Sequence, residues 1–189
     1  MLSAKLGHFL DGPLGTIAKR IPLSPNILTV IGFLFTVVAA FVIPVNIKLG
    51  GILILTGGIF DMLDGIVART GRKVTRFGAF LDSVLDRYSD AFIFLAIAWY
   101  LAERGSHTGV FLSLGTMVGA FLISYTRARA EGIGESCRAG IMERPERIIL
   151  LIFATLTGWL VPILWVMLIL THITVIQRIY HVRRKMNVE

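Results

Sequence analysis

Asp61-Met62-Leu63-Asp64-Gly65-Ile66-Val67-Ala68-Arg69 and, after a basic turn, Gly78-Ala79-Phe80-Leu81-Asp82-Ser83-Val84-Leu85-Asp86 form the stretch that decides the fold. Long apolar runs flank it on both sides. Because a buried unpaired charge costs several kcal/mol or more, these four carboxylates need a positive partner. The stretch therefore predicts a cation site within an apolar, helical chain.

The spacing of the four aspartates predicts that they converge. Asp61 and Asp64 are three residues apart and Asp82 and Asp86 are four apart, so each pair lies on one face of its own helix. A hairpin through the basic turn from Thr70 to Arg76 would bring the two faces together. Hard divalent cations, Mg²⁺ or Mn²⁺, prefer carboxylate and phosphate oxygens. The pattern therefore predicts one or two such ions among the four side chains.

The composition is that of an integral membrane protein. The chain has 189 residues, of which 55% are hydrophobic and 16% are charged, and its mean hydropathy is +0.76. This is too apolar for a soluble protein, and the length suits a single domain over residues 1–189. The one cysteine, Cys137, excludes an internal disulfide. Residues 1–21 lack a clean apolar core, so no cleavable signal is expected.

The apolar runs predict an all-α membrane protein with six transmembrane helices, since about 20 residues cross a bilayer. The expected spans cover residues 27–45, 47–70, 77–101, 108–127, 147–161 and 162–181. Residues 1–23 carry apolar side chains on roughly one helical face, which predicts an interfacial amphipathic helix. Residues 24–185 are then expected to form the six-helix bundle.

The distribution of Lys and Arg predicts the topology. All basic residues except Lys48, Arg87 and Arg104 fall in the N-terminal segment, the 69–76 turn, the 127–147 loop or the C-terminal segment. By the positive-inside rule, both termini and the aspartates face the cytoplasm. The net charge of +7 is then explained by topology and anionic lipid headgroups, and no nucleic-acid partner is expected.

Arg87 and Asp90 follow the last aspartate of the motif inside the third expected span. Two interpretations stay open. These residues orient the metal-binding carboxylates, or they take part in an intramembrane ion pair that packs helices. Neither interpretation makes them catalytic.

The pattern Asp-x2-Asp-Gly-x2-Ala-Arg-x8-Gly-x3-Asp-x3-Asp resembles, without a departure, the signature of the CDP-alcohol phosphotransferases. The resemblance implies six transmembrane helices around a polar, cytosol-facing cavity, in a protein of the cell membrane that is usually a homodimer. It implies Asp61, Asp64 and Asp82 as metal ligands and Asp86 as both ligand and proton acceptor. It also implies a CDP-lipid site formed by Pro25, Asn26, Thr29, Asp61, Gly65, Arg69 and Thr75.

The chemistry follows from a metal-bound pyrophosphate. A metal at the aspartates, most simply a pair of Mg²⁺ or Mn²⁺ ions, would hold the pyrophosphate of the donor while an alcohol attacks and CMP leaves. The attacking hydroxyl must lose its proton, and Asp86, at the end of the motif, is the candidate general base. A divalent-cation transporter is the alternative from another class. It would need acids near the middle of the bilayer with access to both sides.

Three segments indicate the acceptor. The sequences around Arg127, Arg147 and Arg178 resemble those of phosphatidylinositol phosphate and archaetidylinositol phosphate synthases, whose acceptor is already phosphorylated. The resemblance implies CDP-diacylglycerol or CDP-archaeol as donor and myo-inositol 1-phosphate as acceptor. Guanidinium groups bind phosphate in a bidentate manner, so these three arginines are expected to hold the acceptor's phosphate. Glycerol 3-phosphate is the alternative acceptor.

Overall fold

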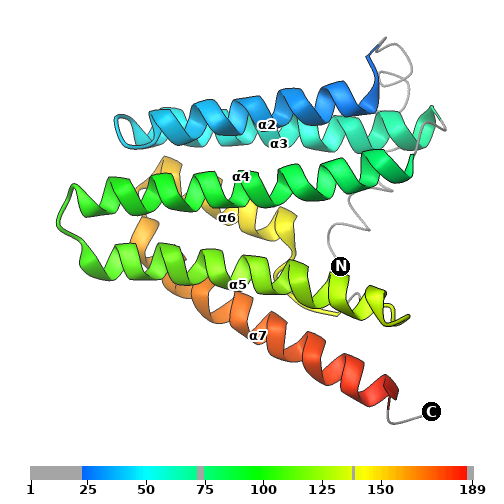
Figure 1. Ribbon diagram of the computed structural model, residues 1–189. Helices are drawn as coiled ribbons and strands as arrows, with labels where there is room; N and C mark the ends of the chain where they lie inside the picture. The colour runs from blue at the N-terminus through cyan, green and yellow to red at the C-terminus, as the bar shows by residue number, and fades with distance from the viewer. Residues whose placement is uncertain (1–22, 72–74, 138, 187–189) are drawn as a thin grey trace.

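The structure is a computed structural model that describes residues 23–71, 75–137 and 139–186, and within these ranges it is all-helical (Figure 1). Its helices are α2 Pro25–Val42, α3 Ile47–Thr70, α4 Arg76–Ala102, α5 His107–Gly132, α6 Arg144–Thr157 and α7 Leu160–Met186. The expected interfacial helix over residues 1–23 lies almost wholly outside the described residues. The six-helix bundle expected after it corresponds to α2–α7.

Local sequence explains where several helices begin and end. Pro25 stands in the first turn of α2, where its missing N–H costs no hydrogen bond. Asn46 and Thr75 cap α3 and α4, since their side-chain oxygens accept from backbone N–H groups three residues on, at 3.1 and 2.9 Å. Gly158 ends α6 with a φ of 81°, a left-handed conformation that glycine adopts without strain. The short α6–α7 connection follows directly.

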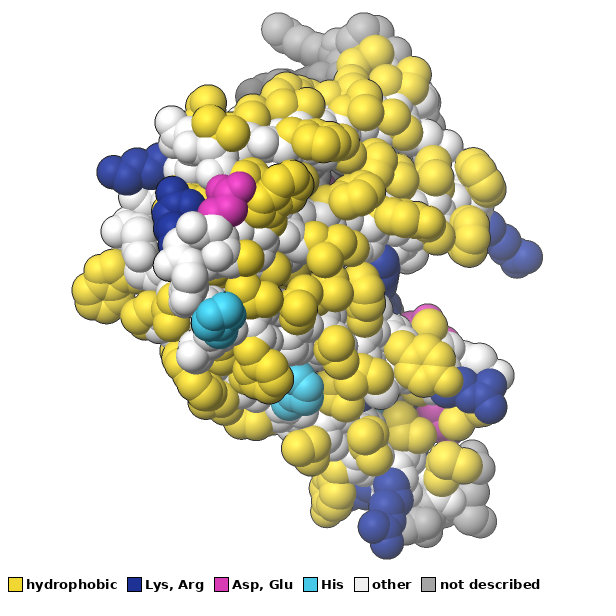
Figure 2. Space-filling model, turned by 60° about the vertical axis from the view of Figure 1, so that its left-hand side comes forward, with side chains coloured by type: hydrophobic (Ala, Val, Ile, Leu, Met, Phe, Trp, Pro, Cys, Tyr) yellow, Lys and Arg dark blue, Asp and Glu magenta, His cyan; other side chains and the backbone are white. Residues whose placement is uncertain are grey.

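Four of the helices, α2, α3, α5 and α7, are long and apolar enough to cross a membrane. Helix α4 is as long but carries Asp82, Asp86, Arg87 and Asp90. Helix α6 has 14 residues, about 21 Å at 1.5 Å per residue, against a hydrocarbon core of about 30 Å. The outer surface is largely apolar, as Figure 2 shows for one face. The protein is therefore a multi-pass membrane protein with a helical fold.

The helices pack as a chain of neighbours. Helix α2 contacts both α3 and α4, α3 contacts α6, and α5 lies between α4 and α7. The main core cluster includes Phe94, Ile97, Leu112, Leu151 and Leu164, all essentially inaccessible to solvent. Among the described helices, α3 and α4 make little backbone contact with each other. They are held beside each other by α2 and α6, which leaves room between them for side chains.

Close approach of α2 and α3 depends on two glycines. A Cβ added at Gly57 would come within 3.0 Å of the Gly32 carbonyl oxygen, and one added at Gly32 within 3.1 Å of the Gly57 carbonyl oxygen. Backbone atoms cannot move aside as a flexible side chain can, so both positions favour glycine. This contact fixes the position of α2 against the helix that carries the first aspartate pair.

One end of the bundle collects the polar motif. The C-terminal ends of α3, α5 and α7 and the N-terminal ends of α2 and α4 lie on the same side of the molecule (Figure 1). The α2–α3 and α4–α5 connections lie at the other end. This alternation brings residues from five helices to one end of the bundle.

Candidate functional site

Three of the four aspartates form a compact carboxylate cluster. Asp61 and Asp64 on α3 and Asp82 on α4 each offer one oxygen, and these oxygens lie within 4.8 Å of one another. Asp64 is 7% exposed, and its Oδ2 has no hydrogen-bond partner within the described residues. Like charges this close repel strongly in a partly buried site unless a cation offsets them. An oxygen-only donor set with an unsatisfied buried oxygen fits a hard divalent cation.

Asp86 lies beside this cluster and is paired with arginines. The Arg144 Nη1 is 2.7 Å from Asp86 Oδ1 and 2.6 Å from Asp61 Oδ2, so one guanidinium joins the two aspartate pairs. The Arg87 Nη1 is 3.5 Å from Asp86 Oδ2. Arg144 opens α6, which is how that helix reaches the space between α3 and α4. The sequence analysis did not predict that Arg144 would bind the aspartates. Arg144 stands only three residues before Arg147, in the segment Glu143-Arg144-Pro145-Glu146-Arg147.

The first turn of α2 lies against the start of α4. The Asn26 Oδ1 would be 2.8 Å from a Cβ added at Gly78, so this glycine leaves space for the amide. Thr29 donates to the Pro25 carbonyl at 3.0 Å and lies beside the carboxyl group of Asp64. The α2 residues expected at the CDP-lipid therefore border the carboxylate cluster.

The remaining residues expected at the donor also lie at this end. The Arg69 guanidinium folds back along α3, with its Nη1 3.1 Å from where a Gly65 Cβ would stand. Thr75 caps α4. Gly65 thus leaves a bare stretch of helix beside a cation, which allows a phosphate-bearing ligand to approach closely.

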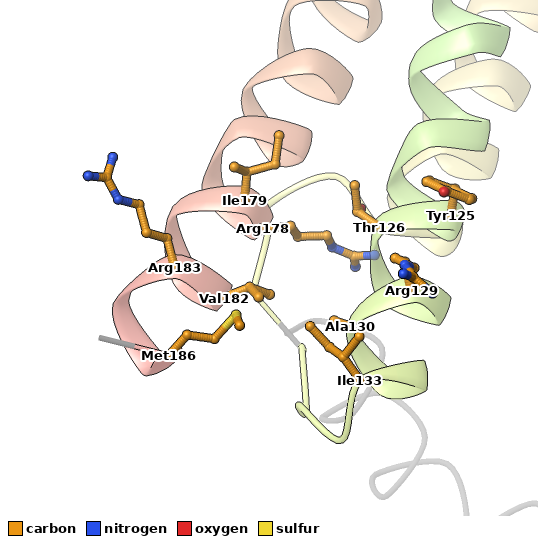
Figure 3. A pocket seen from close by; sticks show the side chains of 10 residues that line it. All are labelled: Tyr125, Thr126, Arg129, Ala130, Ile133, Arg178, Ile179, Val182, Arg183 and Met186. Carbon is orange, nitrogen blue, oxygen red and sulfur yellow. The ribbon is translucent and has the colours of Figure 1, made fainter. Parts of the chain in front are cut away.

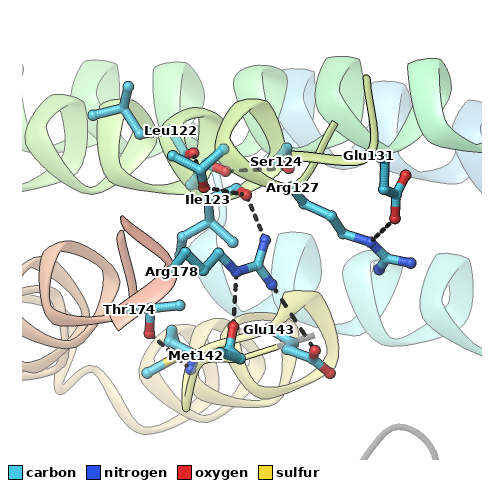
Figure 4. A network of polar contacts seen from close by, with 12 residues as sticks. Leu122, Ile123, Ser124, Arg127, Glu131, Met142, Glu143, Thr174 and Arg178 are labelled. Atoms are coloured by element: carbon cyan, nitrogen blue, oxygen red, sulfur yellow. Dashed lines mark hydrogen bonds and ion pairs between the residues drawn. The ribbon is translucent and has the colours of Figure 1, made fainter. Parts of the chain in front are cut away.

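The arginines expected at the acceptor have different surroundings. Arg178 on α7 is 3% exposed and donates through Nε to the Ala139 carbonyl at 2.8 Å and through Nη1 to the Ile123 carbonyl (Figure 4). Its Nη2 is 4.0 Å from Glu143. Arg127 is exposed and pairs with Glu131 on the next turn of α5 at 2.9 Å. Arg178 thus joins α7 to α5 and to the segment before α6.

Arg147 is committed to a buried ion pair. Its Nη2 is 2.6 Å from Asp90 Oδ2, and both side chains are 2% exposed. Of the two interpretations of Asp90, the structure therefore shows the ion pair that packs helices. Its partner, Arg147 on α6, was expected to hold the acceptor's phosphate. Arg87 instead lies near Asp86. The Arg147–Asp90 pair fixes α6 against α4, about two turns along α4 from Asp82.

Apolar membrane-length helices with a carboxylate cluster at their shared end define a multi-pass membrane protein with a candidate metal site. The chain belongs to the CDP-alcohol phosphatidyltransferase family, whose sequence model matches residues 22–177. It is therefore an enzyme of phospholipid synthesis. Membership in this enzyme family favours the transferase over the alternative of a cation transporter.

Individual relatives of this chain carry the names of enzymes of the same family. The chain is 40% identical over 191 residues to an archaetidylinositol phosphate synthase of Pyrococcus horikoshii, covering 98% of both chains. It is 35% identical over 193 residues to a phosphatidylinositol phosphate synthase of Mycobacteroides abscessus, covering 97% of this chain and 88% of the relative.

Solved structures show the same fold. The phosphatidylinositol phosphate synthase of Mycobacterium tuberculosis with CDP-DAG bound superposes with a TM-score of 0.81, at 31% identity, over 92% of this chain and 93% of the other. The same enzyme in complex with manganese and citrate gives a TM-score of 0.79, at 31% identity, over 91% and 88% of the two chains.

Proposed function

We propose that this enzyme transfers a phosphatidyl or archaetidyl group from a CDP-lipid to myo-inositol 1-phosphate and releases CMP. The carboxylate cluster of Asp61, Asp64 and Asp82, bordered by α2 and by the guanidinium of Arg69, carries the proposal. The names of the relatives from Pyrococcus horikoshii and Mycobacteroides abscessus support the choice of acceptor. Glycerol 3-phosphate remains the second candidate.

The metal would be Mg²⁺ or Mn²⁺, and we propose two ions. Asp61, Asp64 and Asp82 would hold it, and the unpaired Asp64 Oδ2 is a free ligand atom for it. Asp86 is proposed as a further ligand, which requires it to share its charge with Arg144. Bound there, the metal would supply charge neutralisation for the pyrophosphate and the leaving CMP.

The protein's own groups would do the remaining work. Pro25, Asn26, Thr29, Gly65, Arg69 and Thr75 are proposed to hold the cytidine and phosphates of the donor at the end of the bundle. Asp86 would take the proton of the attacking hydroxyl. A carboxylate flanked by Arg144 and Arg87 is held in one place, so its oxygens are oriented before the acceptor arrives.

The acceptor's phosphate is proposed to bind Arg127, Arg147 and Arg178. Arg127 fits this role with least rearrangement, because its present partner, Glu131, forms an exposed pair that stabilises the helix by less than about 1 kcal/mol. Arg178 already donates two guanidinium hydrogens to backbone carbonyls, and its other N–H groups would donate to the phosphate. A direct contact from Arg147 would require its bond to Asp90 to open.

Topology and assembly complete the proposal. Within the described residues, the basic residues of the 69–76 turn, the 127–147 loop and the C-terminal segment belong to the helix ends on the side of the molecule that carries the carboxylates (Figure 1), which supports a cytoplasmic active site and cytoplasmic termini. A water-soluble acceptor would reach the site from that side, and the donor would enter from the adjacent leaflet. We also propose a homodimer, as the family resemblance implies.

The choice of substrates is tested directly. Purified protein in lipid nanodiscs is supplied with CDP-diacylglycerol or CDP-archaeol and with myo-inositol 1-phosphate, free myo-inositol or glycerol 3-phosphate. We expect CMP to form only when donor and phosphorylated inositol are both present. Equal use of free inositol would refute the phosphate-binding role, and preference for glycerol 3-phosphate would move the protein to the second candidate. Release of inorganic phosphate in place of CMP would contradict the reaction itself.

Replacing Arg127 by Ala is expected to raise the acceptor KM about tenfold or more. A charge-assisted hydrogen bond to phosphate stabilises by about 1.5 to 3 kcal/mol, and each 1.4 kcal/mol is a factor of ten. The donor KM should change much less, and Arg127→Glu should be worse than Arg127→Ala. The matched control is Arg104→Ala, which removes an exposed arginine at the opposite end of the bundle. Equal effects of Arg127→Ala and Arg104→Ala on the acceptor KM would exclude Arg127 from the site.

A further inference from the structure

We propose that a groove between the C-terminal halves of α5 and α7 binds one anionic phospholipid of the adjacent membrane leaflet. The groove has a volume of about 430 Å³, and the described residues that line it belong to α5 and α7, with Ile133 directly after α5 (Figure 3). No residue of α2, α3, α4 or α6 reaches it. It is therefore distinct from the carboxylate cluster.

The walls of the groove are suited to a hydrocarbon chain. Tyr125 and Ile133 on one side and Ile179 and Met186 on the other are large side chains that remain 46–63% exposed. Ile133 and Ile179 offer a nucleotide or a polyol no hydrogen-bond partner, so they would only remove part of its hydration. An acyl or isoprenoid chain would instead remove these side chains from contact with mobile lipid and fill the gap between the helices.

The charges at the groove select an anion. Its lining includes Arg129 in the last turn of α5, Arg183 in the last turn of α7 and the buried Arg178 at its base, and none of the described residues that line it is Asp or Glu. Within the part of the chain that the structure describes, no ion pair involves Arg129 or Arg183. Guanidinium groups attract and bind the phosphate of a lipid headgroup through charge-assisted hydrogen bonds.

Position in the membrane favours a lipid as the source of that phosphate. Arg129 and Arg183 stand in the last turns of two membrane-length helices, where such a helix meets the headgroup layer. Tyr125 and Ile179 lie one turn further into these helices, whereas Ile133 and Met186 lie nearer their ends (Figure 3). Basic pockets between transmembrane helices are a general form of anionic-lipid site. The bound lipid would join the ends of α5 and α7 next to Arg178, which already bonds the Ile123 carbonyl of α5.

Native mass spectrometry of the detergent-purified protein tests the site without any turnover. The protein is titrated with phosphatidylglycerol and, separately, with phosphatidylcholine of the same chains. We expect the first phosphatidylglycerol to bind about tenfold more tightly than phosphatidylcholine. The double variant Arg129→Gln/Arg183→Gln should lose this preference. The matched double variant Arg104→Gln/Arg184→Gln, which removes the same charge from exposed arginines outside the groove, should retain it.

Two further measurements make the proposal falsifiable on its own. Val182→Trp would fill the groove while leaving every arginine in place, and it should weaken phosphatidylglycerol binding about tenfold. Retained binding in Val182→Trp, or an equal loss in the Arg104→Gln/Arg184→Gln control, would overturn the site. Inorganic phosphate should not compete with the lipid at the groove, and competition at equal concentration would identify a free-phosphate site instead. The groove shares Arg178 with the proposed acceptor site, but Arg129, Arg183 and Val182 have no role in the proposed reaction, so these variants test the lipid site separately.

Discussion

Replacing Asp82 by Asn is expected to abolish turnover, lowering kcat/KM by about 1,000-fold or more. The substitution keeps the shape of the side chain but removes one carboxylate from the cluster that is proposed to hold the metal at the donor's pyrophosphate. Metal neutralisation of a transferring phosphoryl group contributes several kcal/mol, and about 4 kcal/mol corresponds to a thousandfold in rate. Arg144 bonds Asp61 and Asp86, so Asp82→Asn leaves both of those contacts in place.

The measurement combines activity with metal binding. CMP release is followed for the variant, and Mn²⁺ affinity is measured by titration calorimetry in the absence of substrate. We expect the affinity to fall along with the rate while the thermal unfolding temperature without metal stays the same or rises. The matched control is Glu103→Gln, which neutralises an exposed acid at the other end of α4 and should alter neither quantity. Full activity of the native protein in excess EDTA would contradict the metal site altogether.

Replacing Arg147 by Ala is expected to destabilise the fold by about 3 to 5 kcal/mol. The change strips Asp90 of its partner at a place where both side chains are 2% exposed, and an uncompensated buried charge has this cost. The effect is measured by thermal unfolding of the purified protein, with the fraction that remains monodisperse after heating as the readout. Arg127→Ala is the control, because its exposed pair with Glu131 should contribute less than about 1 kcal/mol.

A double substitution separates the structural role of Arg147 from the proposed binding role. Replacing the pair by Arg147→Met and Asp90→Leu removes both charges and fills the site with apolar side chains, so stability should recover much of what either single variant loses. If Arg147 also binds the acceptor, this stable double variant will still show a raised acceptor KM. A normal acceptor KM would restrict Arg147 to the helix contact. A full loss of stability in the double variant would contradict the ion-pair argument.

Features with local causes could be predicted from the sequence. The length of the apolar runs predicted helices close to those observed, and the second expected span, residues 47–70, coincides with α3. The i,i+3 spacing of Asp61 and Asp64 and the short basic turn between α3 and α4 placed carboxylates of both helices at one end of the bundle. These properties depend on helical periodicity and on short connections, which a single sequence contains.

Several helix boundaries differ from those expected from the apolar runs. Helix α6 ends at Thr157, earlier than the expected 161, because Gly158 takes a left-handed conformation, and α7 then begins at Leu160. Helix α5 continues to Gly132, past the expected 127, since its polar last turns extend beyond the apolar run. Hydropathy locates the apolar part of a helix and not the whole of it.

Partner choice was decided by the tertiary structure. Arg144 bonds Asp61 across 83 residues and Arg147 bonds Asp90 across 57 residues, while the sequence shows only that each arginine stands at the start of α6. Which carboxylate each one meets depends on how α6 packs against α3 and α4, and that packing is set by the whole core. The same holds for the α5–α7 groove, whose cations come from distant segments. The sequence by itself determined the helices and the aspartate motif, whereas the pairing of its charges required the packed bundle, because ion pairs between helices depend on distances in space.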